Sequence, residues 1–223
     1  MTATAPKRFS RRTTPVDARA VTRCPLCEPD AHEILLENSD ALVMIDVRPM
    51  CAGHVLVVPR GHESSVRSVV PNRLKGLMDL ATTAARVLER RWGEAGMYEH
   101  GGGPLCRPHL ARVSSAHAHL HILPISTDIV SRLPAGLRAD RSDVVVNGLH
   151  YLWQRAGPAG DERSTDLIGG VPPHITRTLL QLAFDEYAQP WIPLSAAPRL
   201  HERAIAETRA TFAARQTPSR VRL

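Results

Sequence analysis

The run HAHLHIL at residues 117–123 places a histidine at every second position among apolar residues. Successive side chains of a β-strand point to opposite faces. A strand over residues 116–125 would therefore carry His117, His119 and His121 on one face and bury the residues between them. With 11 histidines in 223 residues, such a run arises by chance about 0.03 times per chain of this composition. The pattern favours a reactive or metal-binding face over an ordinary polar strand face.

Apolar patterns around this run predict an α+β fold, with strands on both sides of one long helix. Short apolar runs predict strands at residues 33–37, 41–46, 54–58, 97–99 and 116–125, the first two forming a hairpin. Apolar residues at helical spacing predict a helix from a cap at Asn72 to about Arg91. This order is typical of an antiparallel sheet with a helix packed against it.

The composition divides the chain into three parts. Residues 1–22 are polar, basic and rich in threonine, so we expect a disordered tail. Residues 23–155 are predicted to form the catalytic domain, and residues 156–223 a helical C-terminal extension. The elements predicted near and after this boundary are a hairpin joining residues 144–146 to 150–153, a loop-rich linker over 157–173, and helices near 175–187 and 200–215.

Charge and hydropathy restrict the partner and the compartment. The net charge of +6 suits an anionic partner, nucleotide or nucleic acid, although basic tails that only aid solubility explain it equally well. No apolar run approaches the roughly 20 residues of a membrane span, and no apolar signal core follows the basic N-terminus. We therefore expect a cytoplasmic protein without a membrane partner.

Two of the four cysteines, Cys24 and Cys27, form a C-x-x-C pair. In a reducing compartment such a pair indicates metal ligands or a redox motif more than a structural disulfide. The spacing alone leaves both uses open, together with simple burial.

The histidine run resembles the signature of the histidine-triad superfamily, in which single apolar residues separate three histidines. Other features follow in the same order. Asp46 lies eight residues before His54, residues 54–62 resemble the strand that precedes the family's main helix, and residues 98–101 resemble the strand that ends beside the phosphates. Ser114 lies three residues before the triad, where one branch carries a catalytic-site serine. The resemblance covers about residues 24–125 and implies a HIT-like α+β fold.

The resemblance implies catalytic roles for four residues. His119 would be the nucleophile that attacks a nucleotide α-phosphorus and forms a nucleotidyl-histidine intermediate, which water resolves. His121 would hydrogen-bond phosphate oxygens and stabilise developing charge. Ser114 would donate a hydrogen bond to the leaving-group atom or the bridging oxygen, or be a plain surface serine. His54 would support the site from the neighbouring strand.

Three further residues are candidates for substrate contact. Asp46 would accept the ribose hydroxyls, or serve as a turn residue. His117, the first triad residue, is a candidate phosphate contact. Glu99 stands where one branch has an asparagine near the phosphates, so it would contact substrate if His100 or an arginine compensated its charge, or would point away.

A zinc site is also implied. Some histidine-triad proteins hold a structural zinc with two cysteines and two histidines, and the matching residues here are Cys24, Cys27, His62 and His117. A Cys₂His₂ set of this kind forms a closed tetrahedral site. His117 would then be a metal ligand that fixes the start of the triad strand, and not a phosphate contact.

These features together indicate a nucleotidyl hydrolase acting on a nucleoside phosphoramidate, a dinucleoside polyphosphate or a nucleoside-diphosphate conjugate. The third triad residue is His121 and not the glutamine of the sugar-phosphate nucleotidyltransferases, which favours hydrolysis over transfer. We expect a small nucleotide rather than nucleic acid as partner, no catalytic cofactor, and a homodimer. The alternatives are a nucleotidyl- or phosphotransferase, a nucleotide sensor without turnover, and a zinc hydrolase whose triad chelates the metal.

Overall fold

The computed structural model describes residues 24–102, 117–138, 150–167 and 174–216. Three predictions lie outside these ranges: the tail over residues 1–22, the strand over 144–146, and Ser114. None of the described helices is long and apolar enough to cross a membrane.

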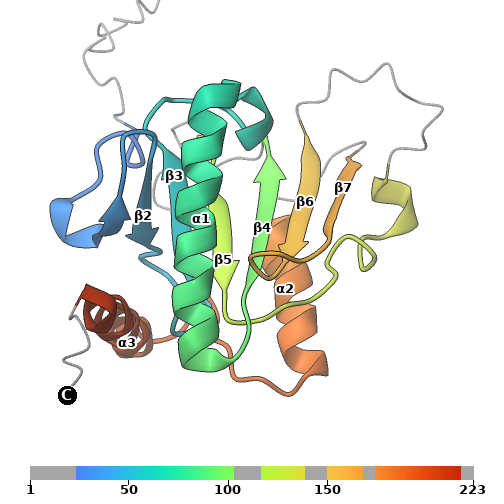
Figure 1. Ribbon diagram of the computed structural model, residues 1–223. Helices are drawn as coiled ribbons and strands as arrows, with labels where there is room; N and C mark the ends of the chain where they lie inside the picture. Colours follow the sequence, from blue (N-terminus) through green and yellow to red (C-terminus); the bar gives the residue numbers. More distant parts are fainter. Residues whose placement is uncertain (1–23, 103–116, 139–149, 168–173, 217–223) are drawn as a thin grey trace, which may run out of the picture.

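The described strands form one antiparallel sheet in the order β1-β2-β3-β5-β4-β6-β7 (Figure 1). Their bounds are β1 Ile34–Glu37, β2 Ala41–Ile45, β3 Val55–Pro59, β4 Gly96–Gly101, β5 Leu120–Leu123, β6 Tyr151–Ala156 and β7 Glu162–Asp166. The predicted α+β fold with an antiparallel sheet is confirmed. The triad strand is central, with β3 on one side and β4 on the other.

β5 is shorter than predicted. It begins at Leu120, so His117 and His119 precede the strand. The N–H of Ala118 donates to the carbonyl of Glu63 at 2.6 Å. Because Glu63 lies in the segment after β3, this bond ties the start of the triad to a loop instead of to the sheet ladder.

The long helix α1, Pro71–Trp92, crosses one face of the sheet (Figure 1). The predicted cap at Asn72 is wrong, because Val70 is the N-cap and Pro71 occupies the first turn, where the missing N–H of proline costs no helical bond. The helix ends at Gly93, whose φ of 89° is the left-handed conformation that glycine adopts readily. Its apolar stripe includes Leu77, Ala81, Ala84 and Leu88. These side chains share a core with Val55 and Val57 of β3 and with Leu120 and Ile122 of β5.

The helix α2, Ile175–Glu186, covers part of the opposite face. Its buried residues Leu179 and Phe184 share a core with Tyr98, Leu123 and Leu152 of the sheet. This face also carries the side chain of His121, because Tyr98 lies directly opposite His121 in the β4–β5 pair.

The last helix, α3 Pro198–Gln216, lies beside α1 and β1. Phe212 enters the core beneath α1. The hydroxyl of Thr208 accepts a hydrogen bond of 2.8 Å from the N–H of Gly53, in the loop between β2 and β3. α3 therefore contacts the loop that leads into β3.

The predicted linker over 157–173 is wrong for Glu162–Asp166, which form β7 and pair with β6. The sequence ERSTD has no apolar alternation, because β7 is a largely exposed edge strand that buries no face. The hairpin in this region joins β6 to β7, and β6 also pairs with β4. The sheet thus continues into the part predicted as a helical extension.

Candidate active site

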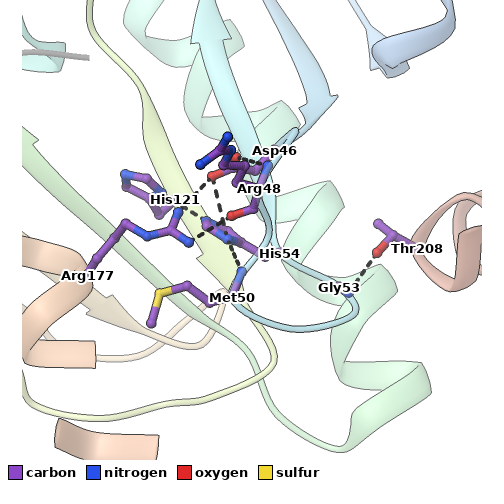
Figure 2. A network of polar contacts seen from close by, with 8 residues as sticks. All are labelled: Asp46, Arg48, Met50, Gly53, His54, His121, Arg177 and Thr208. Atoms are coloured by element: carbon purple, nitrogen blue, oxygen red, sulfur yellow. Dashed lines mark hydrogen bonds and ion pairs between the residues drawn. The ribbon is translucent and has the colours of Figure 1, made fainter. Parts of the chain in front are cut away.

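Asp46, His54 and His121 lie on the face of the sheet that α2 covers. Leu56 of β3 is paired with Met44 of β2 and with His121 of β5, so these three side chains share a face. Asp46 and His54 lie two residues from Met44 and Leu56, just beyond the strands. All three site residues are buried, and Figure 2 shows them close together.

Two hydrogen bonds fix the protonation of His54 and His121. The N–H of Met50 points at Nδ1 of His54 at 3.1 Å, so Nδ1 must be the acceptor. The hydrogen of a neutral His54 ring therefore sits on Nε2, which lies 2.9 Å from Nδ1 of His121. We assign the same tautomer to His121, with an acceptor Nδ1 and a protonated Nε2. His121 thus keeps an N–H to donate beyond the pair.

His119 has the opposite tautomer. Its Nδ1 lies 2.8 Å from the carbonyl oxygen of His117, which can only accept, so Nδ1 carries the hydrogen. The lone pair is then on Nε2, the nitrogen farther from the backbone. The rings of His119 and His121 meet edge to face with centroids 4.9 Å apart. A nitrogen lone pair and a donor N–H therefore come from neighbouring imidazoles.

Burial keeps the imidazoles of His54 and His121 neutral. It lowers the pKa of His54 to about 4, with Asp46 opposing the change and Arg177 adding to it. Burial also holds the pKa of His121 well below its usual value, helped by the charge that His119, His54 and Arg177 place nearby. Neutral rings are required for the tautomers assigned above.

Asp46 accepts hydrogen bonds on both carboxylate oxygens. Oδ1 accepts from the N–H of Arg48 at 2.9 Å, and Oδ2 lies 3.3 Å from Nη1 of Arg177. Nη2 of Arg177 donates to the carbonyl of Arg48 at 2.7 Å. Figure 2 shows Arg177 extending from α2 into this network. The Asp46 side chain keeps 11% of its surface exposed.

Sequence reasoning missed Arg177. One signal was available, because Arg177 lies three and seven residues before Leu180 and Phe184, on the apolar stripe of α2. An arginine at a core position of an amphipathic helix needs an acceptor. The pattern does not say which residue supplies that acceptor, because the partner is far away in the chain.

Glu99 does not join the histidines. It follows Tyr98 in β4 and so faces α1, on the other side of the sheet. Its carboxylate accepts from the N–H of Val66 at 2.8 Å and from the hydroxyl of Tyr151 at 2.5 Å. The expected contact of Glu99 with phosphates is therefore not what the structure shows, and the alternative that it points away holds. Burial raises its pKa to about 7.

Cys24, Cys27, His62 and His117 form a second cluster. Their sulfur and nitrogen atoms all lie within 4.8 Å of one another. The sulfur of Cys27 is 3.0 Å from Nδ1 of His62, and Nδ1 of His117 is 3.3 Å and 3.4 Å from the two sulfurs. In a tetrahedral zinc site with ordinary bond lengths, sulfur and nitrogen ligands lie roughly 3.5 Å apart. The residues therefore fit the implied metal.

The other ring nitrogen of His117 supports this fit. Nε2 lies 3.1 Å from the carbonyl of Pro59 and must donate to it, so the lone pair is on Nδ1, facing the sulfurs. Metal-bound histidines usually donate their second N–H in this way. The side chain of His117 is thus turned to the cysteines, and its carbonyl to His119.

The same geometry bears on the zinc-hydrolase alternative. Among the described residues, the three triad histidines do not form one potential metal cluster; His117 belongs to the cysteine group and His121 to a group with Asp46 and His54. In the second group the ring nitrogens of His54 and His121 already face each other as donor and acceptor. We interpret Asp46, His54 and His121 as a hydrogen-bonded group of side chains and not as a metal site.

Comparison with known proteins identifies this arrangement. The family model for the HIT domain matches residues 29–128. This part of the chain is a HIT domain, the domain of the histidine-triad superfamily. The match includes the triad, His54, Asp46 and His62, whereas Cys24 and Cys27 precede it and Arg177 follows it. The presence of a HIT domain indicates a nucleotide hydrolase or transferase in general terms.

Solved structures of HIT proteins resemble the chain at low identity. A hypothetical histidine triad nucleotide-binding protein from Sulfolobus tokodaii is 13% identical, with 86% of this chain and 93% of that chain covered and a TM-score of 0.40. A HIT family hydrolase from Clostridium thermocellum is 21% identical, with coverage of 46% and 90% and a TM-score of 0.32. A Zn-bound histidine triad family protein from Mycobacterium smegmatis is 24% identical, with coverage of 41% and 63% and a TM-score of 0.29.

Proposed function

We propose that this protein is a nucleotidyl hydrolase in which His119 attacks the α-phosphorus of a nucleotide conjugate. The observation that carries the proposal is the pair of opposite tautomers on neighbouring rings. The bond from His119 Nδ1 to the carbonyl of His117 leaves the lone pair on Nε2, and the bond from His54 leaves an N–H on His121. A nucleophile beside a donor is what phosphoryl substitution requires.

The reaction proceeds in two steps. Nε2 of His119 forms a bond to the α-phosphorus as the bond to the leaving group breaks, and the leaving group departs with the electron pair. The N–H of His121 donates to a non-bridging oxygen, where negative charge develops. Water then attacks the same phosphorus, the bond to His119 breaks, and the nucleoside monophosphate and a proton are released.

Asp46 and Ser114 complete the proposed site. Asp46, whose side chain is 11% exposed, accepts hydrogen bonds from the ribose hydroxyls. Ser114, outside the described residues, donates to the leaving group. The substrate classes are nucleoside phosphoramidates, dinucleoside polyphosphates and nucleoside-diphosphate conjugates, all of which offer an α-phosphorus with a leaving group.

We also propose that Cys24, Cys27, His62 and His117 hold a structural zinc. A closed set of four ligands leaves no open position for substrate, so the metal would stabilise the fold and supply no chemistry at phosphorus. These residues join the segment before β1, the segment after β3 and the start of the triad, which lie far apart in the sequence.

Intact-mass spectrometry tests the reaction directly. The protein is mixed with a panel of phosphoramidates, dinucleoside polyphosphates and nucleoside-diphosphate conjugates and then quenched in denaturant within milliseconds. We expect a protein species heavier by one nucleotidyl group, which is absent in His119→Ala. Product that accumulates without any such species in the wild type would overturn the covalent route.

The same quench separates hydrolysis from transfer. Under hydrolysis the nucleotidyl group appears as the monophosphate, whereas a transferase passes it to an added acceptor. Tight binding without turnover of any panel member would instead indicate a sensor. The expected homodimer stays a prediction, which light scattering of the purified protein would check.

A further inference from the structure

Arg177 lies 49 residues beyond the end of the HIT domain match, yet its guanidinium reaches the histidine face. Its side chain is 7% exposed, so the charge is held inside the protein. A buried arginine is costly unless its hydrogens find acceptors. Here Asp46 and the carbonyl of Arg48 are those acceptors.

The loop between β2 and β3 is held by the C-terminal part of the chain at several points. Nη2 of Arg177 bonds the carbonyl of Arg48 at 2.7 Å. The N–H of Ile192, between α2 and α3, donates to the carbonyl of Met50 at 2.6 Å. Met50 itself is buried in the core that α2 forms with the sheet. The position of the Met50 N–H is therefore fixed from outside the HIT domain match.

The N–H of Met50 donates to Nδ1 of His54 and so favours the tautomer with its hydrogen on Nε2. The carboxylate of Asp46 would favour the tautomer with its hydrogen on Nδ1. Oδ2 of Asp46 lies 3.7 Å from Nδ1 of His54. A carboxylate free to approach would accept a hydrogen bond from Nδ1 and favour the other tautomer. Arg177 binds the same Oδ2 at 3.3 Å and so holds it as the partner of a cation.

In the competing tautomer of His54, His121 would lose the Nε2–H that donates to substrate. With its hydrogen on Nδ1, His54 would turn a lone pair on Nε2 toward His121, 2.9 Å away. His121 would then have to donate through Nδ1, and its Nε2 would carry a lone pair instead of a hydrogen. The ring could no longer donate to a phosphate oxygen.

We propose that Arg177 is a positioning residue that acts through Asp46 and the β2–β3 loop to hold His54, and hence His121, in the tautomer that donates to substrate. The role of His121 as a phosphate donor rests on the function proposed above. The tautomers themselves are properties of the free protein and are measured without substrate.

Two-bond ¹H–¹⁵N correlation spectra of histidine-labelled full-length protein test the proposal, because a protonated and an unprotonated ring nitrogen differ widely in chemical shift. In the wild type we expect protonated Nε2 and unprotonated Nδ1 on both His54 and His121. In Arg177→Met, both rings should shift toward a protonated Nδ1. Arg177→Lys, which restores the charge beside Asp46, should recover the wild-type spectrum at least in part.

Two further variants make the experiment decisive. Arg132→Met is the matched control, because Arg132 pairs with Glu186 of α2 without reaching the histidines, and its histidine signals should match the wild type. Arg177→Gln keeps a donor for the carbonyl of Arg48 and so preserves the fold if Arg177→Met does not. Wild-type tautomers in whichever of Arg177→Met and Arg177→Gln folds would overturn the proposal.

Kinetics separate this proposal from the proposed function. On a substrate of the panel, Arg177→Met should lower kcat by on the order of 10²-fold, the usual cost of one lost donor to a developing negative charge. Shifted tautomers without turnover of any conjugate by the wild type would refute the hydrolase and leave the positioning role standing. Turnover by the wild type with unmoved tautomers in the Arg177 variants would refute the positioning role alone.

Discussion

The backbone carbonyl of His117 holds the ring of His119, through an Nδ1 to oxygen distance of 2.8 Å. The side chain of His117 meanwhile faces Cys24 and Cys27. One residue therefore links the candidate metal cluster to the candidate nucleophile. Two alternate positions of one motif therefore face different clusters of side chains.

Replacing His119 removes the proposed nucleophile itself. His119→Ala should leave the fold intact and lower kcat by several orders of magnitude, since no other group reaches the phosphorus in its place. Steady-state assays and circular dichroism check the two parts. Added imidazole should partly restore His119→Gly. A His119→Ala enzyme that keeps more than a tenth of the wild-type rate would sink the covalent mechanism.

The cysteine cluster should bind one zinc per chain. Cys24→Ser should lose the metal and lower thermal stability more than it changes the rate of chemistry, because a closed site contributes folding energy. Elemental analysis and calorimetry measure both effects. Cys51→Ala, at a buried cysteine outside the cluster, should retain the metal. A wild-type protein that is metal-free, stable and active would refute this prediction.

Asp46 should distinguish ribonucleotides from nucleotides without ribose hydroxyls. Asp46→Asn is preferable to alanine, because its amide oxygen still offers Arg177 an acceptor. The loss of charge should weaken ribonucleotide binding by about 1.5–3 kcal/mol, the usual worth of a hydrogen bond to a charged group. Titration calorimetry with a 2′,3′-dideoxynucleotide is the control and should show almost no change. Equal losses on both ligands would mean that Asp46 serves only the loop.

Glu99 should make stability depend on pH. Burial raises the pKa of its carboxyl from 4.5 to about 7, so the native state binds a proton that the unfolded state releases between these values. The contribution is fully present below pH 4.5 and is lost as the pH rises toward 7. Its size is on the order of 1–3 kcal/mol.

Glu99→Gln should remove this dependence. Thermal melts between pH 5 and 8 should show the wild type losing more stability than Glu99→Gln as the pH rises. Glu202→Gln, at an exposed position of α3, should follow the wild type. Parallel curves for all three proteins would show that Glu99 titrates in its usual range.

The sequence predicted the parts of this molecule that depend on local patterns. Apolar runs predicted β1, β2 and β3, of which β2 and β3 are buried at every position, and helical spacing predicted α1, which buries one face. β7 was missed because an exposed edge strand leaves no such pattern. The start of β5 was misplaced because the Ala118 N–H bonds to a loop, a contact that strand periodicity does not encode.

The candidate site divides in the same way. The resemblance of the histidine run predicted the cluster of Cys24, Cys27, His62 and His117, which lie together in space. The position of Glu99 was left open because one residue of register decides which face of β4 it takes. Arg177 was missed because its partners lie about 130 residues earlier, and helical spacing predicts only that it is buried.

The sheet sets a lower limit on how far this chain can be trimmed. A fragment excised at residues 29–128, the length that sequence comparison recognises, would take β4 without β6 and expose a row of unpaired backbone groups. It would also uncover the apolar face of Tyr98 and Leu123, which α2 shields from water. Such a fragment should self-associate when expressed alone. The segment that matches the family model is therefore shorter than the segment that we expect to fold without self-association.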